Sequence, residues 1–275
     1  MKLTKLAITT LIAMGATAMA GTASAQQRVT VNIGSSHPTT NHEQLIEIFD
    51  KLNATVPALR DSWAAQNMVP LSSLITDSYD IYATFPVKDM ASLKNKRINA
   101  PGTSANWLRD TGATPVDGAL TTYYTNIQTG VTDGALSFAS GIGPARVYEV
   151  AKNLTRVDVG AMYFGSVAVN KKFFDGLPKD VQDAMRAAGK ATSVAHGKHV
   201  TKTANAALET MKAAGLQITD LPQAEKTKWV NGLPNIVAPW LQGTGDNGKA
   251  VLKAYFDELR ARGVKPLRDW DSQAR

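Results

Sequence analysis

Three segments near the middle of this 275-residue chain decide the fold. They are Leu93-Lys-Asn-Lys-Arg-Ile-Asn-Ala-Pro-Gly102, Tyr123-Tyr-Thr-Asn-Ile-Gln-Thr-Gly-Val-Thr-Asp-Gly134 and Val169-Asn-Lys-Lys-Phe-Phe-Asp-Gly-Leu-Pro178. All three lie between Phe85 and Met185, where short strand patterns alternate with helical ones. Such alternation predicts an α/β fold with parallel strands.

The alternation can be followed residue by residue in this region. Pro101-Gly102 stops the first strand, and Gly130 is placed to end a helix. Strands are predicted at residues 97–100, 114–116, 135–138 and 162–170, and helices at 90–94, 104–112, 120–129 and 145–152.

The chain changes character after Pro178. Residues 180–214 are almost all helix formers, and their apolar positions keep helical spacing. Gly189 and Gly197 weaken this helix by about 1 kcal/mol each relative to alanine. At 1.5 Å per residue the helix extends roughly 50 Å, so we expect it to span two lobes.

The two ends of the chain add further elements. A strand is predicted at 29–33, helices at about 45–52 and after Thr55-Val-Pro57, and strands at 69–74 and 79–85, joined by a polar turn at 76–78. Three more helices are predicted at 222–230, 237–242 and 248–262.

The first 25 residues have the pattern of a secretory signal peptide. Lys2 and Lys5 precede an apolar stretch, and Ala23-Ser-Ala25 is a cleavage site of small residues. The expected product is an exported, periplasmic protein. Cleavage would lower the net charge from +7 to +5. The remaining charges are dispersed, which argues against nucleic-acid binding.

The sequence gives little support for catalysis or metal binding. The chain has no cysteine, which excludes thiolate chemistry. Ser137 and Ser140 lack a neighbouring histidine, and a hydrolase would need such a base. His196 and His199 share a helix face, but no carboxylate adjoins them, so we expect surface histidines. We therefore predict a protein that is not an enzyme, with no cofactor and no metal site.

The three quoted segments, in this order, resemble the substrate-binding subunits of tripartite ATP-independent periplasmic (TRAP) transporters. The resemblance covers the chain from about Phe85 to its C-terminus, together with the first strand. It implies the α/β fold of a type II-like periplasmic solute-binding protein, with two lobes and a long spanning helix. It also implies a cleft that closes by a hinge motion on an organic acid, and delivery of that solute to the membrane subunits of a transporter.

Candidate solute-binding residues come from motif positions and from strand ends. The resemblance implies Asn99, Leu120 and Ser137 by their motif positions. The carboxyl ends of strands, where α/β proteins bind ligands, and aromatic side chains near them suggest the remaining candidates. These are Ser36, His37, Trp107, Tyr123 and Tyr163. For the three aromatic residues, core packing and a place in the solute site both stay open.

Two features depart from the family pattern. The family usually has an arginine where this chain has Asn99, and that arginine clamps the substrate carboxylate. Arg97, two residues earlier on the same strand face, is a possible replacement. In addition, residues 26–84 are too few for an ordinary first lobe. We expect an internal deletion near residues 39–41, a truncated N-terminal lobe and weak binding.

The predicted organisation is a signal peptide at 1–25 and truncated N-terminal lobe elements at 26–84. A second α/β lobe with the cleft residues follows at 85–170, and the long helix and C-terminal helices occupy 171–275. The predicted function is that of a monomeric periplasmic receptor for an organic acid such as a C4-dicarboxylate. A non-binding remnant of such a receptor and a periplasmic α/β enzyme are the alternatives.

Overall fold

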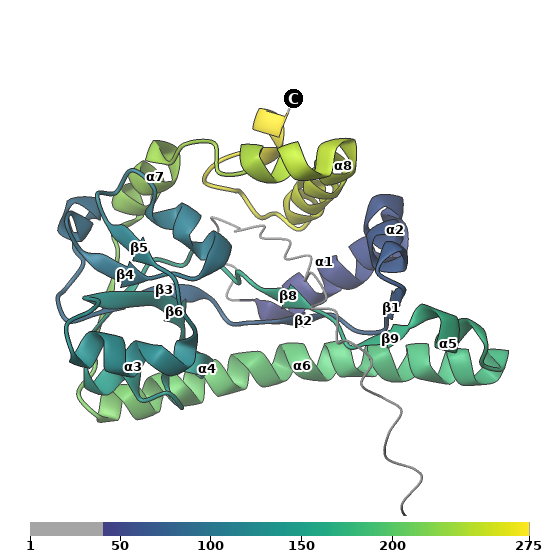
Figure 1. The fold of residues 1–275 in the computed structure, drawn as a ribbon, viewed down its shortest axis with the longest axis horizontal. Helices are drawn as coiled ribbons and strands as arrows, with labels where there is room; N and C mark the ends of the chain where they lie inside the picture. Colours follow the sequence, from purple (N-terminus) through teal and green to yellow (C-terminus); the bar gives the residue numbers. More distant parts are fainter. Residues whose placement is uncertain (1–40, 275) are drawn as a thin grey trace, which may run out of the picture. The chain divides into compact units, whose positions relative to one another are not determined.

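A computed structural model describes residues 41–274 of the chain, and a six-stranded sheet is its largest layer (Figure 1). The strand order is β10-β7-β3-β6-β4-β5. The strands are β3 (Tyr79–Ala83), β4 (Arg97–Asn99), β5 (Thr114–Val116), β6 (Gly134–Phe138), β7 (Asn153–Arg156) and β10 (Gln217–Asp220).

This sheet is mixed rather than parallel. Strand β4 pairs in parallel with both β5 and β6, and β7 pairs in parallel with β10, as the alternating pattern predicts. Strand β3 is antiparallel to both its neighbours, β6 and β7. The chain enters the sheet through β3 from an extended segment, with no crossover helix that would reverse its direction.

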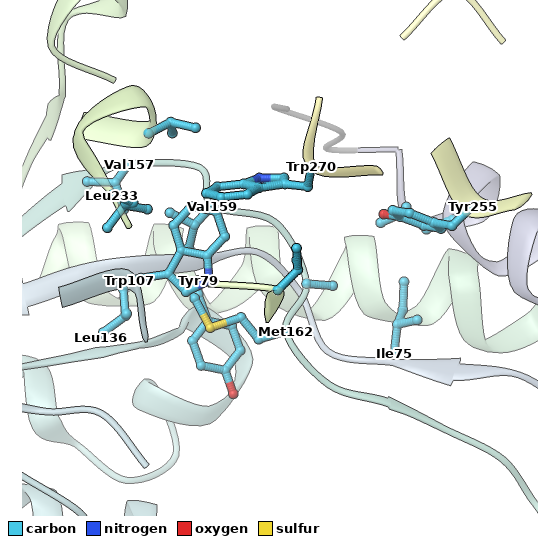
Figure 2. Close-up of a cluster of buried hydrophobic side chains, with 14 of the residues drawn as sticks. Ile75, Tyr79, Trp107, Leu136, Val157, Val159, Met162, Leu233, Tyr255 and Trp270 are labelled. Carbon is cyan, nitrogen blue, oxygen red and sulfur yellow. The ribbon is translucent and has the colours of Figure 1, made fainter. Parts of the chain in front are cut away.

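The two faces of the sheet pack against different hydrophobic clusters. In β3, Ile81 and Ala83 belong to one cluster and Tyr82 belongs to the other. Strand β6 divides in the same way, with Leu136 on the first face and Ala135 on the second. This period of two places the residues of each strand alternately on opposite faces. Figure 2 shows part of the first cluster, including Tyr79, Trp107 and Leu136.

Two short antiparallel ladders lie outside the sheet. Strand β1 (Met68–Pro70) pairs with β9 (Ala168–Asn170), and β2 (Leu74–Ile75) pairs with β8 (Phe164–Gly165). The sequence predicted one continuous strand for each of these segments, and each is divided. Between β1 and β2, the backbone N–H of Ser73 donates to the hydroxyl of Ser193 instead of to a neighbouring strand.

The long helix α6 (Lys179–Ala213) confirms the predicted 35-residue element and connects these parts. It packs against α1 (His42–Thr55), against β2, and against α4 (Ala139–Ile142) beside the sheet. Figure 1 shows α6 running past the ladders and on to the sheet.

The remaining helices surround the sheet and the ladders. They are α2 (Pro57–Ala65), α3 (Leu120–Gln128), α5 (Lys171–Asp175), α7 (Gln223–Gly232), α8 (Ala238–Ala261) and the 3-10 turns η1 (Met90–Leu93), η2 (Gly102–Leu108), η3 (Val147–Glu149) and η4 (Trp270–Ala274). Helix α8 contains the break predicted between residues 242 and 248, because Gly245 has non-helical dihedral angles. No helix within residues 41–274 has both the length and the apolar character needed to cross a bilayer.

The helices predicted at 90–94 and 104–112 are the 3-10 turns η1 and η2, and η2 ends at Leu108. The helix predicted at 145–152 is wrong. Residues 145–152 form only the turn η3, while α4 begins earlier, at Ala139. Arg146 has a left-handed backbone (φ 56°), which interrupts a helix at this position. Strands β7 and β10, which lie on either side of helix α6 in the sequence, were not predicted.

Gly189 on α6 accounts for the close approach of this helix to the segment between β1 and β2. A Cβ at Gly189 would stand 2.0 Å from the carbonyl oxygen of Leu71. Gly197, two turns later, faces the backbone of Glu43 in the same way, at 3.1 Å. The two glycines that weaken the isolated helix are thus required by its packing.

Substituting Gly189→Ala is expected to lower the free energy of unfolding by about 1–3 kcal/mol, because the methyl group overlaps a backbone carbonyl that cannot rotate away. Gly232→Ala, on the exposed end of α7 where nothing lies within 4 Å, is the matched control. It should leave stability unchanged or raise it by up to about 1 kcal/mol. Chemical denaturation measures both variants, and equal stabilities for the two would contradict this packing argument.

Candidate functional site

The candidate site lies at the carboxyl ends of three parallel strands of the sheet; this row of strand ends is called the site edge below. Strand β4 leads into Pro101-Gly102, β5 leads to Asp117, and β6 ends at Phe138. Strand β3 is antiparallel to β6, so its first residue, Tyr79, is the register partner of Phe138. Ligands of open α/β sheets bind at this type of edge.

Three aromatic rings meet at this edge. The ring centroid of Tyr79 lies 5.2 Å from that of Phe138 and 5.9 Å from that of Tyr163. Tyr163 comes from the segment before β8, far along the chain from the other two. Both distances fall within the range of favourable aromatic pairs.

Two polar groups contact the backbone that follows β4. The hydroxyl of Tyr163 donates to the carbonyl oxygen of Pro101 at 3.4 Å. The backbone N–H of Gly102 donates to the Asp117 carboxylate, also at 3.4 Å. Gly102 has a φ of +55°, and the nearest atom to a Cβ at this position would be the Tyr163 hydroxyl, 3.9 Å away. The site thus brings a carboxylate and a phenol together around one glycine.

Helix α3 supplies Leu120 and Tyr123 to the same region. A Cβ on Gly141 would stand 2.7 Å from the Phe138 ring and 2.9 Å from Leu120 Cδ2. Leu120 and Phe138 therefore close around Gly141, and Leu120 is half-buried. Tyr123 is buried, with an exposed fraction of 2%.

The tyrosines of this edge stay protonated at neutral pH. Burial raises the pKa of Tyr79, and the nearby Tyr163 and Tyr123 raise it further. Burial also raises the pKa of Tyr123, with further contributions from Tyr163 and Asp117. The pKa of Tyr163 is raised by burial and then by Asp117. The hydroxyls therefore act as neutral hydrogen-bond donors and acceptors.

Two of these hydroxyls have no hydrogen-bond partner within residues 41–274. Tyr79 and Tyr123 are 3% and 2% exposed, and neither hydroxyl bonds to a described residue. Neither oxygen is among the buried side-chain atoms that lack a partner, so both hydroxyls reach solvent although most of each side chain is buried. We refer to Tyr79, Tyr123 and Tyr163 as the tyrosine cluster.

Asn99, a predicted binding residue, has its side chain engaged inside the protein. It is fully buried, and its amide donates to the hydroxyl of Thr132 at 2.7 Å and to the carbonyl oxygen of Gly134 at 3.0 Å. Its own oxygen accepts from Asn126 on α3 at 3.2 Å. These bonds join β4 to the turn between α3 and β6.

Arg97, considered above as a replacement for the family arginine, lies at the other end of β4. Its guanidinium donates to the carbonyl oxygen of Gly130 at 2.8 Å and pairs with Asp133 at 3.5 Å. Both partners precede β6, whereas the tyrosine cluster lies where β6 ends. The Arg97 side chain thus lies at the opposite ends of the strands from the tyrosine cluster.

The remaining predicted site residues are Ser137, Trp107, Ser36 and His37, and none of them belongs to the tyrosine cluster. Ser137 is buried on β6, opposite Asp80 of β3. Trp107 is buried in the first hydrophobic cluster (Figure 2). Its ring centroid lies 5.9 Å from that of Trp229. Ser36 and His37 lie outside the described residues.

His196 is not a surface histidine, which corrects the prediction. It is half-buried against β2, with Nε2 2.8 Å from the carbonyl oxygen of Ile75 and 3.1 Å from its nitrogen. His199, one turn along α6, is exposed as predicted. Within the described part of the chain, no group of three or more histidine and acidic side chains could hold a metal ion.

Comparison with known proteins identifies the family. The model of the bacterial extracellular solute-binding proteins, family 7, matches residues 12–242. The chain belongs to this family. The match confirms both the resemblance to TRAP receptors and the predicted α/β fold.

Two curated proteins illustrate how similar the chain is to individual relatives. The ectoine-binding periplasmic protein TeaA of Halomonas elongata is 24% identical over 226 residues, which cover 81% of this chain and 66% of that protein. The C4-dicarboxylate-binding periplasmic protein DctP of Rhodobacter capsulatus is 33% identical over 146 residues, which cover 52% and 43%. The chain thus spans less than two thirds of the length of these curated relatives.

Solved family structures share the fold. The ectoine-binding protein of the TeaABC TRAP transporter in its apo state superimposes with a TM-score of 0.71 at 23% identity, covering 82% of this chain and 74% of that one. A Bordetella pertussis extracytoplasmic solute receptor that binds pyroglutamic acid gives a TM-score of 0.68 at 21% identity, covering 82% and 73%.

A buried acid, Asp80, lies next to Tyr79 on β3. Asp80 accepts hydrogen bonds from the backbone of Val157 and Asp158, at 2.8 and 3.0 Å. Asp158 also forms an ion pair with Lys226 of α7. Burial, followed by the negative charge of Asp158, raises the pKa of Asp80 to about 7.

The raised pKa predicts that Asp80 makes stability depend on pH. The folded state binds this proton more tightly than the unfolded state, whose pKa is 3.8. The resulting stabilisation is complete below about pH 4 and is lost as the pH rises to about 7, at a rate on the order of 1 kcal/mol per pH unit. In Asp80→Asn this part of the slope should disappear. Asp61→Asn, an exposed acid on α2, should keep the wild-type slope. Denaturation at several pH values tests this, and parallel curves for D80N and wild type would refute it.

Asn99→Ala is expected to lower the free energy of unfolding by about 1–3 kcal/mol, because Thr132 and Asn126 lose their partner in a buried setting. Asn247→Ala, at an exposed position of α8, is the control and should change stability by less than about 0.5 kcal/mol. Chemical denaturation gives both values. Unchanged stability in N99A would show that these bonds do not support the fold.

Proposed function

We propose that this family 7 protein is a periplasmic receptor that binds a small organic acid and delivers it to the membrane subunits of a TRAP transporter. The observation that carries the proposal is the tyrosine cluster, which presents two accessible hydroxyls without partners among the described residues, at the carboxyl ends of the parallel strands where α/β proteins bind ligands. The family match over residues 12–242 supports the same function.

The solutes named for its relatives support an organic acid. They include C4-dicarboxylate, galacturonate and pyroglutamate. Neutral tyrosine hydroxyls can donate hydrogen bonds to a carboxylate oxygen, and hydrogen bonds to a charged group are among the stronger ones. The cluster therefore has suitable groups for one end of such a solute.

The hinge proposed for solute capture consists of the two ladders, β1–β9 and β2–β8. All four strands are two or three residues long and are interrupted between the ladders. Rotation of a lobe needs only a few such positions to change their dihedral angles. The predicted signal peptide at 1–25 and the monomeric state remain parts of this proposal.

The truncated first lobe also remains a proposal. Helix α1 begins directly at its N-cap Asn41, whose side-chain oxygen accepts from the backbone of Gln44 at 2.9 Å. This start coincides with the predicted deletion near residues 39–41. A shortened lobe would cover the tyrosine cluster less completely, so we expect weak solute binding.

An enzyme is the less favoured alternative. Ser140, considered as a nucleophile, donates its hydroxyl proton to Asp77 and not to a histidine. The usual activated serine is paired with a histidine base, and no described histidine bonds to Ser140. The geometry around Ser140 thus supports a structural bond between the turn before β3 and helix α4.

A thermal-shift and calorimetric screen of the full chain tests the receptor function. The screen contains succinate, malate, galacturonate, pyroglutamate, proline and 4-aminobutyrate. At least one acid should stabilise the fold, by about 2.7 kcal/mol at 100 times its Kd, and should be recovered unchanged. The Tyr79→Phe, Tyr123→Phe double variant should fold but bind that acid at least about tenfold more weakly. No stabilisation by any acid would favour the non-binding remnant, and product formation would favour the enzyme.

A further inference from the structure

Asp117 gives the candidate site a negative charge. It lies in the loop after β5, is exposed, and accepts from the backbone of Gly102. Gly102 also faces the Tyr163 hydroxyl, so the carboxylate and the tyrosine cluster flank one short segment. Within residues 41–274, Asp117 forms no ion pair with a lysine or arginine.

Neither the residue at the position of the family's arginine, Asn99, nor its expected replacement, Arg97, brings a positive charge to the site. The amide of Asn99 is fully engaged with Thr132, Gly134 and Asn126. The guanidinium of Arg97 is held at the opposite edge of the sheet. The described side of the site therefore offers neutral hydroxyls and one carboxylate.

This combination disfavours a solute with two carboxylates. If one carboxylate accepts from the tyrosine hydroxyls, a second one near Gly102 would meet the like charge of Asp117. Two like charges within a few ångströms of each other repel. A nitrogen that donates a hydrogen bond would instead make a charge-assisted contact with Asp117.

We propose that the solute carries both a carboxylate and an N–H-bearing or cationic nitrogen. Its carboxylate accepts from the hydroxyls of Tyr79 and Tyr123, and its nitrogen donates to Asp117. This inference rests on the proposed receptor function and narrows its substrate to amino-acid-like or lactam acids. Simple C4-dicarboxylates are then poor ligands.

Calorimetric titration of the full chain tests the preference. Succinate and 4-aminobutyrate form a matched pair, since both have four carbons and differ in whether the second end is a carboxylate or an ammonium group. Proline and pyroglutamate are the cyclic nitrogen acids, and malate is the second dicarboxylate. The tightest nitrogen acid should bind about tenfold or more tightly than either dicarboxylate.

Two variants test the assigned residue. Asp117→Asn should weaken the binding of the tightest nitrogen acid by about tenfold and reduce its advantage over succinate. Asp110→Asn is the matched control, because Asp110 is an exposed acid in a neighbouring loop, and its left-handed backbone (φ 59°) is one that asparagine tolerates. It should leave both affinities unchanged.

The outcomes separate the two proposals. Equal or tighter binding of a dicarboxylate, or an unchanged preference in D117N, overturns the inference and leaves the receptor function standing. Binding of no acid in the panel overturns the receptor function and the inference with it.

Discussion

The close packing of α6 against the crossing segments is the constraint on which the rest of the structure depends. Gly189 allows the backbone around Leu71 to lie directly on the helix. One turn later, the Ser193 hydroxyl accepts from the backbone of Ser73 at 2.8 Å and donates to Asp50 of α1 at 3.0 Å. One small side chain thereby holds α1, α6 and the entry to β2 together. A larger residue at either position would separate the helix from the strands.

This packing determines how the candidate site is assembled. Because the segment through β2 is fixed on α6, the chain reaches β3 from outside the sheet, and β3 runs antiparallel to β6. Its first residue, Tyr79, then lies beside the last residue of β6, Phe138. The returning segment brings Tyr163 to the same point through its pairing beside β2. The site is therefore a product of topology, with contributions from three distant parts of the chain.

The sequence predicted those features that local patterns determine. Strand β5, helix α6 and the break in α8 follow from periodicity and from glycine positions, and all three are present as predicted. Strands β7 and β10 were missed because their place depends on pairing with each other and with β3. The same limit applies to the site. Tyr123 and Tyr163 could be selected as aromatics near predicted strand and helix ends, but Tyr79 required knowledge that β3 is antiparallel. His196 was misjudged because its partner, Ile75, is 121 residues away.

Asn99 and the tyrosine cluster differ in role: the hydrogen bonds of Asn99 support the fold, whereas the tyrosines are the groups proposed to bind the solute. Both are buried and polar, and the sequence offered no means of distinguishing them. The Asn99 side chain bonds to Thr132, Gly134 and Asn126 within the protein, and these hydrogen bonds offset the desolvation cost of burying it. The hydroxyls of Tyr79 and Tyr123 lack partners within residues 41–274 and are not among the buried unpartnered atoms, so both can bond to a molecule from solvent. The side chain at the position of the family's charged clamp, Asn99, is thus engaged within the protein, whereas the neutral phenols proposed to bind the solute lie at the opposite strand ends from Arg97.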